Sequence, residues 1–183
     1  MLKITKEWLV SKEACQDGFE WFVEQNKEFE PVELIDLLIK ENQLDWANWL
    51  VVRVMNYSQY VSYAVFAAEQ VIENYEKQYP DDKRPREAIE AAKRCIENPS
   101  DENKKEAANS ASYSAAYSAA RAAYWAACAA SAASAADSAA RGAVNAADSA
   151  ADRSAYRAAR AAKSAKILKK ILKYGIKLLT EGK

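Results

Sequence analysis

Residues 107–165 constrain the fold more than any other part of the chain, because 30 of these 59 positions are alanine. Alanine has the highest intrinsic helix propensity, and no proline occurs from Lys104 to Lys183. The pentapeptide Ala-Asp-Ser-Ala-Ala occurs at 136–140 and again at 147–151, and this spacing equals about three helical turns. The stretch therefore predicts helix rather than disorder.

The length of this helical region predicts that it folds back on itself. A single helix of about 80 residues would be about 120 Å long, whereas a compact domain of this size is about 40 Å across. We expect antiparallel helices with breaks near Ser131–Ser134 and Gly142–Asn145. Alanine faces can pack within one chain or between two, so a homodimer is an open possibility.

Turn and cap signals divide the rest of the chain into shorter helices. In the first part, Thr5 predicts the start of a helix over 6–12, Gln16–Gly18 a turn, Pro31 the first residue of the next helix and Asp45 an N-cap. Further along, we expect one helix from about Ser58 to about Gln78, another from Pro85 and a third capped by Ser100. The predicted fold is all-α, with an acidic, aromatic-rich region (1–57) packed on an alanine-rich antiparallel helical bundle (58–183).

Charge is distributed unevenly along the chain. The formal net charge is zero, but residues 1–102 carry 21 acidic against 12 basic residues and residues 103–183 carry 5 against 14. Such a split indicates an electrostatic partner, or two halves that attract each other.

The residue types argue against catalysis. Histidine is absent, which removes the commonest general base and the commonest metal ligand. The sequence has no glycine-rich phosphate loop and no dinucleotide-binding fingerprint. Cys15, Cys95 and Cys128 are too scattered for a zinc site and are typical of reduced thiols in a cytoplasmic protein. We expect no enzyme activity, no cofactor, no metal, no signal peptide and no membrane span.

The strongest positional pattern is a basic stripe near the C-terminus. Its residues recur every three or four positions and are Arg153, Arg157, Arg160, Lys163, Lys166, Lys170, Lys173 and Lys177, with Lys169 beside them. Leu168, Ile171, Leu172, Ile176 and Leu179 make the apolar face of the same helix. The stripe fits nucleic-acid phosphates, an acidic protein surface or an anionic membrane, and it equally fits an ordinary solvated face.

Two patterns in the first part of the chain are candidates for a second contact surface. A row of carboxylates at Glu28, Glu30, Glu33, Asp36, Glu41 and Asp45 can imitate a phosphate backbone, or can be the polar face of an ordinary helix. Aromatic residues at Trp8, Trp21, Trp46 and Trp49, with Phe19 and Phe22, fit either an exposed hot spot or a packed core.

Three stretches resemble a known group of proteins. They are 4–22, with Ile4-Thr5-Lys6-Glu7-Trp8-Leu9 and Glu20-Trp21-Phe22; 44–50, Leu44-Asp45-Trp46-Ala47-Asn48-Trp49-Leu50; and 80–92, which begins Pro80-Asp81-Asp82-Lys83-Arg84-Pro85 and precedes the alanine repeats. The combination resembles small prophage and mobile-element proteins. In size and general character the chain also resembles the anti-CRISPR inhibitors of type II systems. The last stretch with its alanine tail is also similar to immunity proteins of bacterial polymorphic toxin systems.

The resemblance implies a function in the bacterial host cell. An inhibitor of this kind binds the guide-loaded type II CRISPR nuclease stoichiometrically and blocks DNA binding or cleavage. Its acidic part would enter the positively charged nucleic-acid channel, and its basic helix would contact guide RNA or acidic protein. The alternatives are neutralisation of a cognate toxin and an accessory role in nucleic-acid binding. The immunity family often has histidines among its alanines, and this chain departs from that pattern.

Overall fold

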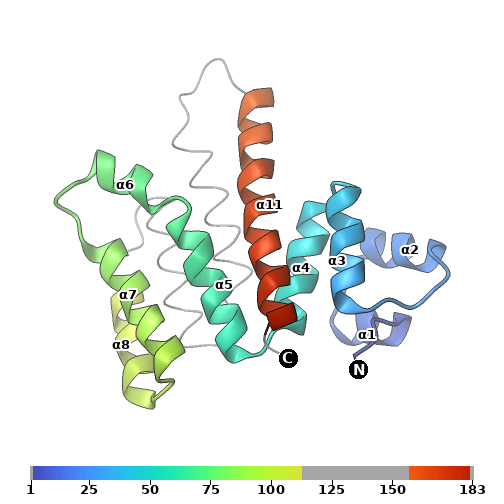
Figure 1. The fold of residues 1–183 in the computed structure, drawn as a ribbon, viewed down its shortest axis with the longest axis horizontal. Coiled ribbons are helices and arrows are strands. Elements are labelled where there is room, and N and C mark those ends of the chain that lie inside the picture. The colour runs from blue at the N-terminus through green and yellow to red at the C-terminus, as the bar shows by residue number, and fades with distance from the viewer. Residues whose placement is uncertain (1, 113–156, 182–183) are drawn as a thin grey trace. The chain divides into compact units, whose positions relative to one another are not determined.

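The structure of the protein, a computed structural model, describes residues 2–112 and 157–181. Within these ranges, nothing is described of the side chains of residues 74, 75, 78, 108–112 and 157–164. The described part is all-α, as predicted: it has no β-strand, and Ile4 and Phe29 form an isolated antiparallel bridge. The predicted breaks in the alanine-rich region lie outside the described residues. The chain divides into two compact units, Met1–Val54 and Met55–Lys183 (Figure 1).

The first unit is built from short helices around a small apolar core. Its helices are α1 (Lys6–Ser11), α2 (Gln16–Glu24), α3 (Pro31–Lys40) and α4 (Leu44–Val54). Thr5 caps α1 by accepting a hydrogen bond from the Trp8 N–H (3.2 Å), and Pro31 begins α3, as the sequence predicts. The buried side chains come from all four helices and from the bridge, and include Ile4, Leu9, Phe22, Phe29, Leu34, Ile35, Leu38, Leu50 and Val51.

Two predictions for this unit were wrong. Gln16–Gly18 is not a turn but the start of α2, and Gly18 packs closely: a Cβ there would lie 3.2 Å from Cys15 Sγ and 3.6 Å from the Trp46 ring. Asp45 is not an N-cap, because α4 begins one residue earlier, at Leu44. The carbonyl of Gln43 already accepts from the Ala47 N–H (3.0 Å), so Asp45 lies within the first turn.

In the second unit, α5 is the central described helix. The helices are α5 (Tyr57–Glu69), α6 (Ile72–Gln78), α7 (Arg84–Glu97), α8 (Asp101–Ser112) and α11 (Arg157–Glu181). α5 packs against both α7 and α11, and Figure 1 shows it between them. The core includes Tyr63, Ala64 and Ala67 of α5, Ala88, Ile89 and Ala92 of α7, and Ile171 and Leu172 of α11.

The predicted helix from Ser58 to Gln78 is in fact two helices. Asn56 forms a capping box with Gln59, so α5 begins at Tyr57. It ends at Glu69, and the break before α6 lets both Val71 and Ile72 be buried. The start of α7 beside Pro85 and the cap by Ser100, which accepts from the Asn103 N–H (3.2 Å), are confirmed.

No described helix has both the length and the apolar character needed to cross a membrane.

Candidate macromolecule-binding surface

The C-terminal helix α11 is fixed to α5 along one side. Ile171 and Leu172 are fully buried, and the Tyr174 ring stacks on Phe66 with centroids 4.1 Å apart and planes at 16°. Near the end of the helix, Gln59 Nε2 donates a hydrogen bond to the Leu178 carbonyl (2.8 Å). These contacts set the rotation of α11 about its axis, so they decide which residues point outward.

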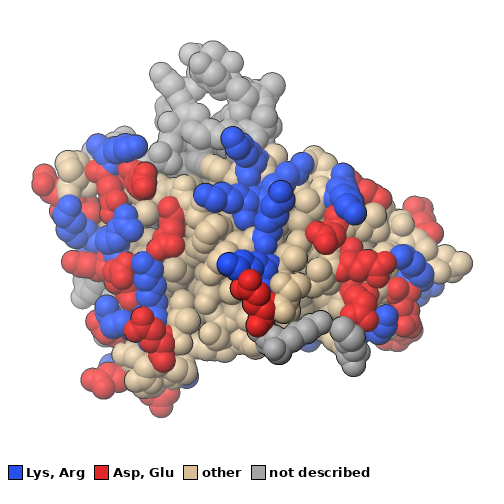
Figure 2. Space-filling view, in the orientation of Figure 1, with Lys and Arg blue, Asp and Glu red and all other residues tan. Residues whose placement is uncertain are grey.

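The outward side of α11 is a row of exposed lysines. Lys166, Lys170, Lys173 and Lys177 are exposed, and we call these four residues the lysine face. At about 100° per residue they fall within an arc of about 60°, spread over about 16 Å of helix. Lys169 is half-buried at the edge of this arc. Figure 2 shows the basic side chains gathered over α11, whereas red and blue side chains alternate over α7.

The described surroundings of the lysine face leave most of its charge uncompensated. Within the described residues, Lys166, Lys170 and Lys173 form no ion pair. Lys177 lies 3.8 Å from Glu181, a long and exposed contact at the end of the row. Lys170 Nζ also lies 5.9 Å from the centre of the Phe66 ring, a weak cation–π contact. The face is therefore a concentrated positive surface.

The other predicted members of the basic stripe are less fully described. Arg153 lies outside the described residues. Arg157, Arg160 and Lys163 belong to the first turns of α11, but their side chains are not described. The structure therefore brings Lys166, Lys170, Lys173 and Lys177 onto one side of the helix, and the extension of this row toward Arg153 stays a prediction.

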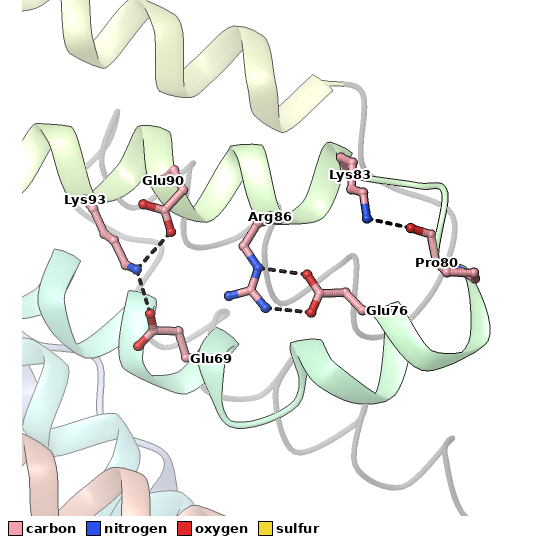
Figure 3. Close-up of polar contacts among 7 residues, drawn as sticks. All are labelled: Glu69, Glu76, Pro80, Lys83, Arg86, Glu90 and Lys93. Carbon is pink, nitrogen blue, oxygen red and sulfur yellow. Dashed lines mark hydrogen bonds and ion pairs between the residues drawn. The ribbon is translucent and has the colours of Figure 1, made fainter.

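Basic residues of α7, by contrast, are paired with carboxylates of neighbouring helices (Figure 3). Arg86 donates two hydrogen bonds to Glu76 of α6, at 2.8 and 2.6 Å. Lys93 lies 2.9 Å from Glu69 of α5 and 2.9 Å from Glu90 of its own helix. The hydrogen bonds from Arg86 lower the pKa of Glu76, and those to Glu69 and Glu90 raise the pKa of Lys93.

Contacts of this kind also give a structural role to the stretch 80–92. Lys83 Nζ donates to the Pro80 carbonyl (2.6 Å), and Arg84 pairs with Asp82 (2.7 Å). Together with Arg86 they shape the turn between α6 and α7 and join the two helices. Lys83, Arg84 and Arg86 of this stretch are thus engaged in contacts within the fold.

The predicted acidic row is also partly used within its own unit. Glu30 pairs with Lys3 (3.1 Å) and Glu33 with Lys27 (2.8 Å). Glu41 accepts a hydrogen bond from Trp21 Nε1 (3.1 Å). Glu28 and Asp36 are exposed and form no ion pair with another described residue. The row is therefore a less uniform charged surface than the lysine face.

The tryptophans of the first unit lie in two half-buried pairs. Trp8 meets Trp49 edge to face at 6.2 Å, and Trp21 is tilted against Trp46 at 6.0 Å. Of the two phenylalanines named with them, Phe22 is buried and Phe19 is half-buried. These contacts account for the aromatic spacing through packing between helices.

One buried polar contact joins α5 to α7. The Tyr57 phenol donates to the thiol of Cys95, and burial raises the pKa of Tyr57 to about 12. Burial also raises the pKa of the Cys95 thiol, which makes that thiol a poor nucleophile. Among the described residues, no three histidine, cysteine or acidic side chains are grouped in a way that could hold a metal ion.

Sequence reasoning missed three residues that position the lysine face. Gln59, Phe66 and Tyr174 hold α11 against α5. Asn56 followed three residues later by Gln59 is a capping-box signal that could have located the start of α5. No sequence signal marks the bond from Gln59 to Leu178, because its two ends are 119 residues apart.

No protein-family model, curated protein or solved structure matches the chain.

Proposed function

We propose that the protein is a stoichiometric inhibitor that binds the guide-loaded type II CRISPR nuclease in the bacterial cytoplasm. The observation that supports this proposal is the lysine face on α11, where Lys166, Lys170 and Lys173 are exposed and form no ion pair with described residues. A rigid row of uncompensated positive charge attracts a polyanionic partner over a distance of about one Debye length. The guide-loaded nuclease carries such a polyanion, its RNA.

Inhibition by binding requires no reactive side chain in the inhibitor. The protein would occupy a surface that the nuclease needs for loading target DNA or for the rearrangement that permits cleavage. Two exposed carboxylates of the first unit, Glu28 and Asp36, would meet basic protein surface in the same complex. Affinity would come from the lysine face and from surrounding shape complementarity, since exposed ion pairs alone contribute little.

The test is target cleavage by guide-loaded nuclease, measured while the protein is titrated from below to above the nuclease concentration. We expect cleavage to stop near a 1:1 ratio. The triple variant K166E/K170E/K173E should need at least about tenfold more protein for the same inhibition, because each reversal replaces attraction with repulsion.

A matched control carries the same change in net charge at exposed lysines elsewhere. Lys12, Lys40 and Lys105 are exposed and form no ion pair with described residues, so K12E/K40E/K105E should inhibit like the unmodified protein. Complete cleavage at a large excess of the unmodified protein would rule out the proposed function. Equal weakening by both triple variants would show that net charge matters and that the lysine face does not.

A further inference from the structure

The side chains on the lysine face indicate which chemistry it recognises. Between residues 165 and 181 the exposed residues of α11 are these four lysines, Thr180 and Glu181, with no arginine, asparagine or glutamine. Arginine, asparagine and glutamine read base edges through paired hydrogen bonds; lysine can also contact guanine, but its compact charge is well suited to phosphate oxygens. A surface whose basic residues are all lysines therefore favours a phosphate backbone over a particular base sequence.

The described part of α11 offers little support for stacking of unpaired bases. Tyr174 is the one aromatic residue of the helix between residues 165 and 181, and its ring is stacked on Phe66. Proteins that hold single strands combine positive charge with exposed aromatic rings on which bases stack. The Phe66 and Tyr174 rings beside the lysine face are half-buried and stacked on each other, so they are poorly placed to stack on a base, and among the described residues a base-paired nucleic acid fits this face better than a single strand.

The narrow shape of the lysine face favours the A-form double helix. The lysines lie within an arc of about 60° and extend over about 16 Å. In A-form RNA the major groove is deep and narrow, so a straight row of charges at its mouth can reach phosphates of both strands. In B-form DNA the major groove is about 12 Å wide, and the same row reaches the phosphates of one strand.

We infer that the lysine face binds the phosphate backbone of double-stranded RNA, without regard to base sequence. This inference rests on the proposed function, since it names the component of the guide-loaded nuclease that the same surface contacts. In that complex the ligand is a base-paired segment of the guide RNA. Glu181, 3.8 Å from Lys177, reduces the charge at one end of the row.

The experiment measures binding of the full-length protein to labelled 20-base-pair duplexes in the absence of nuclease. The probes are an RNA duplex, a DNA duplex of the same sequence, an RNA duplex of scrambled sequence and single-stranded RNA. We expect the two RNA duplexes to bind equally, and at least about threefold more tightly than the DNA duplex or the single strand. The logarithm of affinity should fall with the logarithm of salt concentration with a slope of roughly −3 to −4, about 0.9 per phosphate contact.

Variants identify the surface. K166E/K170E/K173E should lose duplex binding at 100 mM salt, and K12E/K40E/K105E should retain it, with circular dichroism confirming that both variants are folded. The milder K170Q should reduce the salt slope by about one, and E181Q should strengthen binding about twofold.

Three results would overturn the inference: DNA duplex bound as tightly as RNA duplex, no RNA binding at 50 mM salt, or equal loss in the two triple variants. Because no nuclease is present, these outcomes are independent of the inhibition assay. Inhibition without RNA binding would leave the proposed function standing and assign the lysine face to an acidic protein surface. RNA binding without inhibition would support the assignment of the lysine face to double-stranded RNA and rule out the proposed function.

Discussion

Two helices of the second unit, α7 and α11, use basic residues in opposite ways. Both pack against α5 through buried small or aliphatic side chains. On α7, Arg86 and Lys93 reach carboxylates of α5 and α6 that lie beside the helix. On α11, Lys166 and Lys170 are exposed and form no ion pair with a described carboxylate. The helices differ in their own composition, since α7 carries three glutamates and α11 carries only Glu181, and they differ in the carboxylates that neighbouring helices supply.

The comparison shows how a structural charge can be distinguished from a binding charge. A basic residue beside a facing carboxylate forms an ion pair within the fold, and this pair weakens its attraction for an anion on a partner. A basic residue on the side opposite the buried face keeps its full attraction for an outside anion. Sequence periodicity alone assigns both kinds of residue to a charged helix face.

Removing a buried side chain of α11 should give the largest effect. Leu172→Ala removes a fully buried side chain from the α11 packing, so we expect the free energy of unfolding to fall by about 2–5 kcal/mol. Lys173→Ala, at the adjacent exposed position, should change it by less than about 0.5 kcal/mol. Urea denaturation followed by circular dichroism measures both. Equal losses would mean that the lysine side of α11 is also part of the core.

The hydrogen bond that fixes the end of α11 can be tested by an isosteric change. Gln59→Glu keeps the acceptor for the Asn56 N–H but places a carboxylate oxygen against the Leu178 carbonyl. We expect a net loss of about 1 kcal/mol at pH 7, after the favourable effect of a negative charge at the start of a helix. Below about pH 4 the loss should shrink, because a protonated carboxyl can donate.

The control for Gln59→Glu is Asn56→Asp, which adds the same charge near the start of α5 and keeps the capping acceptor. This variant should be as stable as the original chain. If both variants lose stability equally, the added charge is the cause, and the bond to Leu178 contributes little.

A double-mutant cycle compares the charges of the two helices directly. Arg86 and Glu76 are joined by two hydrogen bonds and are each about one-third exposed, with side-chain values of 37% and 31%. We expect a coupling energy of about 0.5–1 kcal/mol from Arg86→Ala and Glu76→Ala, in the upper part of the range for surface pairs. The exposed pair Lys177 and Glu181 should couple by less than about 0.3 kcal/mol.

The same pair predicts a pH dependence. Because Arg86 holds the pKa of Glu76 below its usual value, the folded chain binds fewer protons at Glu76 than the unfolded chain does. The stabilisation is present above the unfolded carboxyl pKa of about 4.3 and is lost as the pH falls through the lower folded value. Arg86→Ala should therefore make the stability less sensitive to acid between about pH 5 and 3. Identical acid profiles would contradict the pairing.

The smallest effect concerns the contact of Tyr57 with Cys95. The pKa of Tyr57 is raised to about 12, so the folded chain keeps a proton there that the unfolded chain loses near pH 10. Its contribution to stability is present below pH 10 and is lost as the pH rises toward 12. Burial also raises the pKa of Tyr60 and of Tyr174, so phenolate absorbance should show a late phase from several tyrosines. The late phase should lose the amplitude of one tyrosine in Tyr57→Phe and keep it in Tyr79→Phe. An unchanged late amplitude in Tyr57→Phe would show that Tyr57 does not titrate late.

Local signals in the sequence were sufficient for several helix ends and for the fold class. Thr5, Pro31 and Ser100 act through groups within a few residues of themselves, so their roles could be predicted without knowing the fold. The prediction for Asp45 was wrong by the position of the helix start, since α4 begins at Leu44, and the prediction for Gly18 was wrong because packing overrides its local preference for a turn. Gly18 lies in α2, where its hydrogen faces Cys15 and Trp46.

By itself, the sequence determined that the chain is helical and that basic residues share one side of its C-terminal helix, because spacing along a helix fixes their relative angles. Only the tertiary structure decided which charges are already paired. Glu76 and Arg86 are ten positions apart, and Gln59 and Leu178 are 119 apart, so no local pattern links them. Whether a charge is neutralised depends on what packing brings within a few ångströms of it, and that proximity is a property of the folded chain.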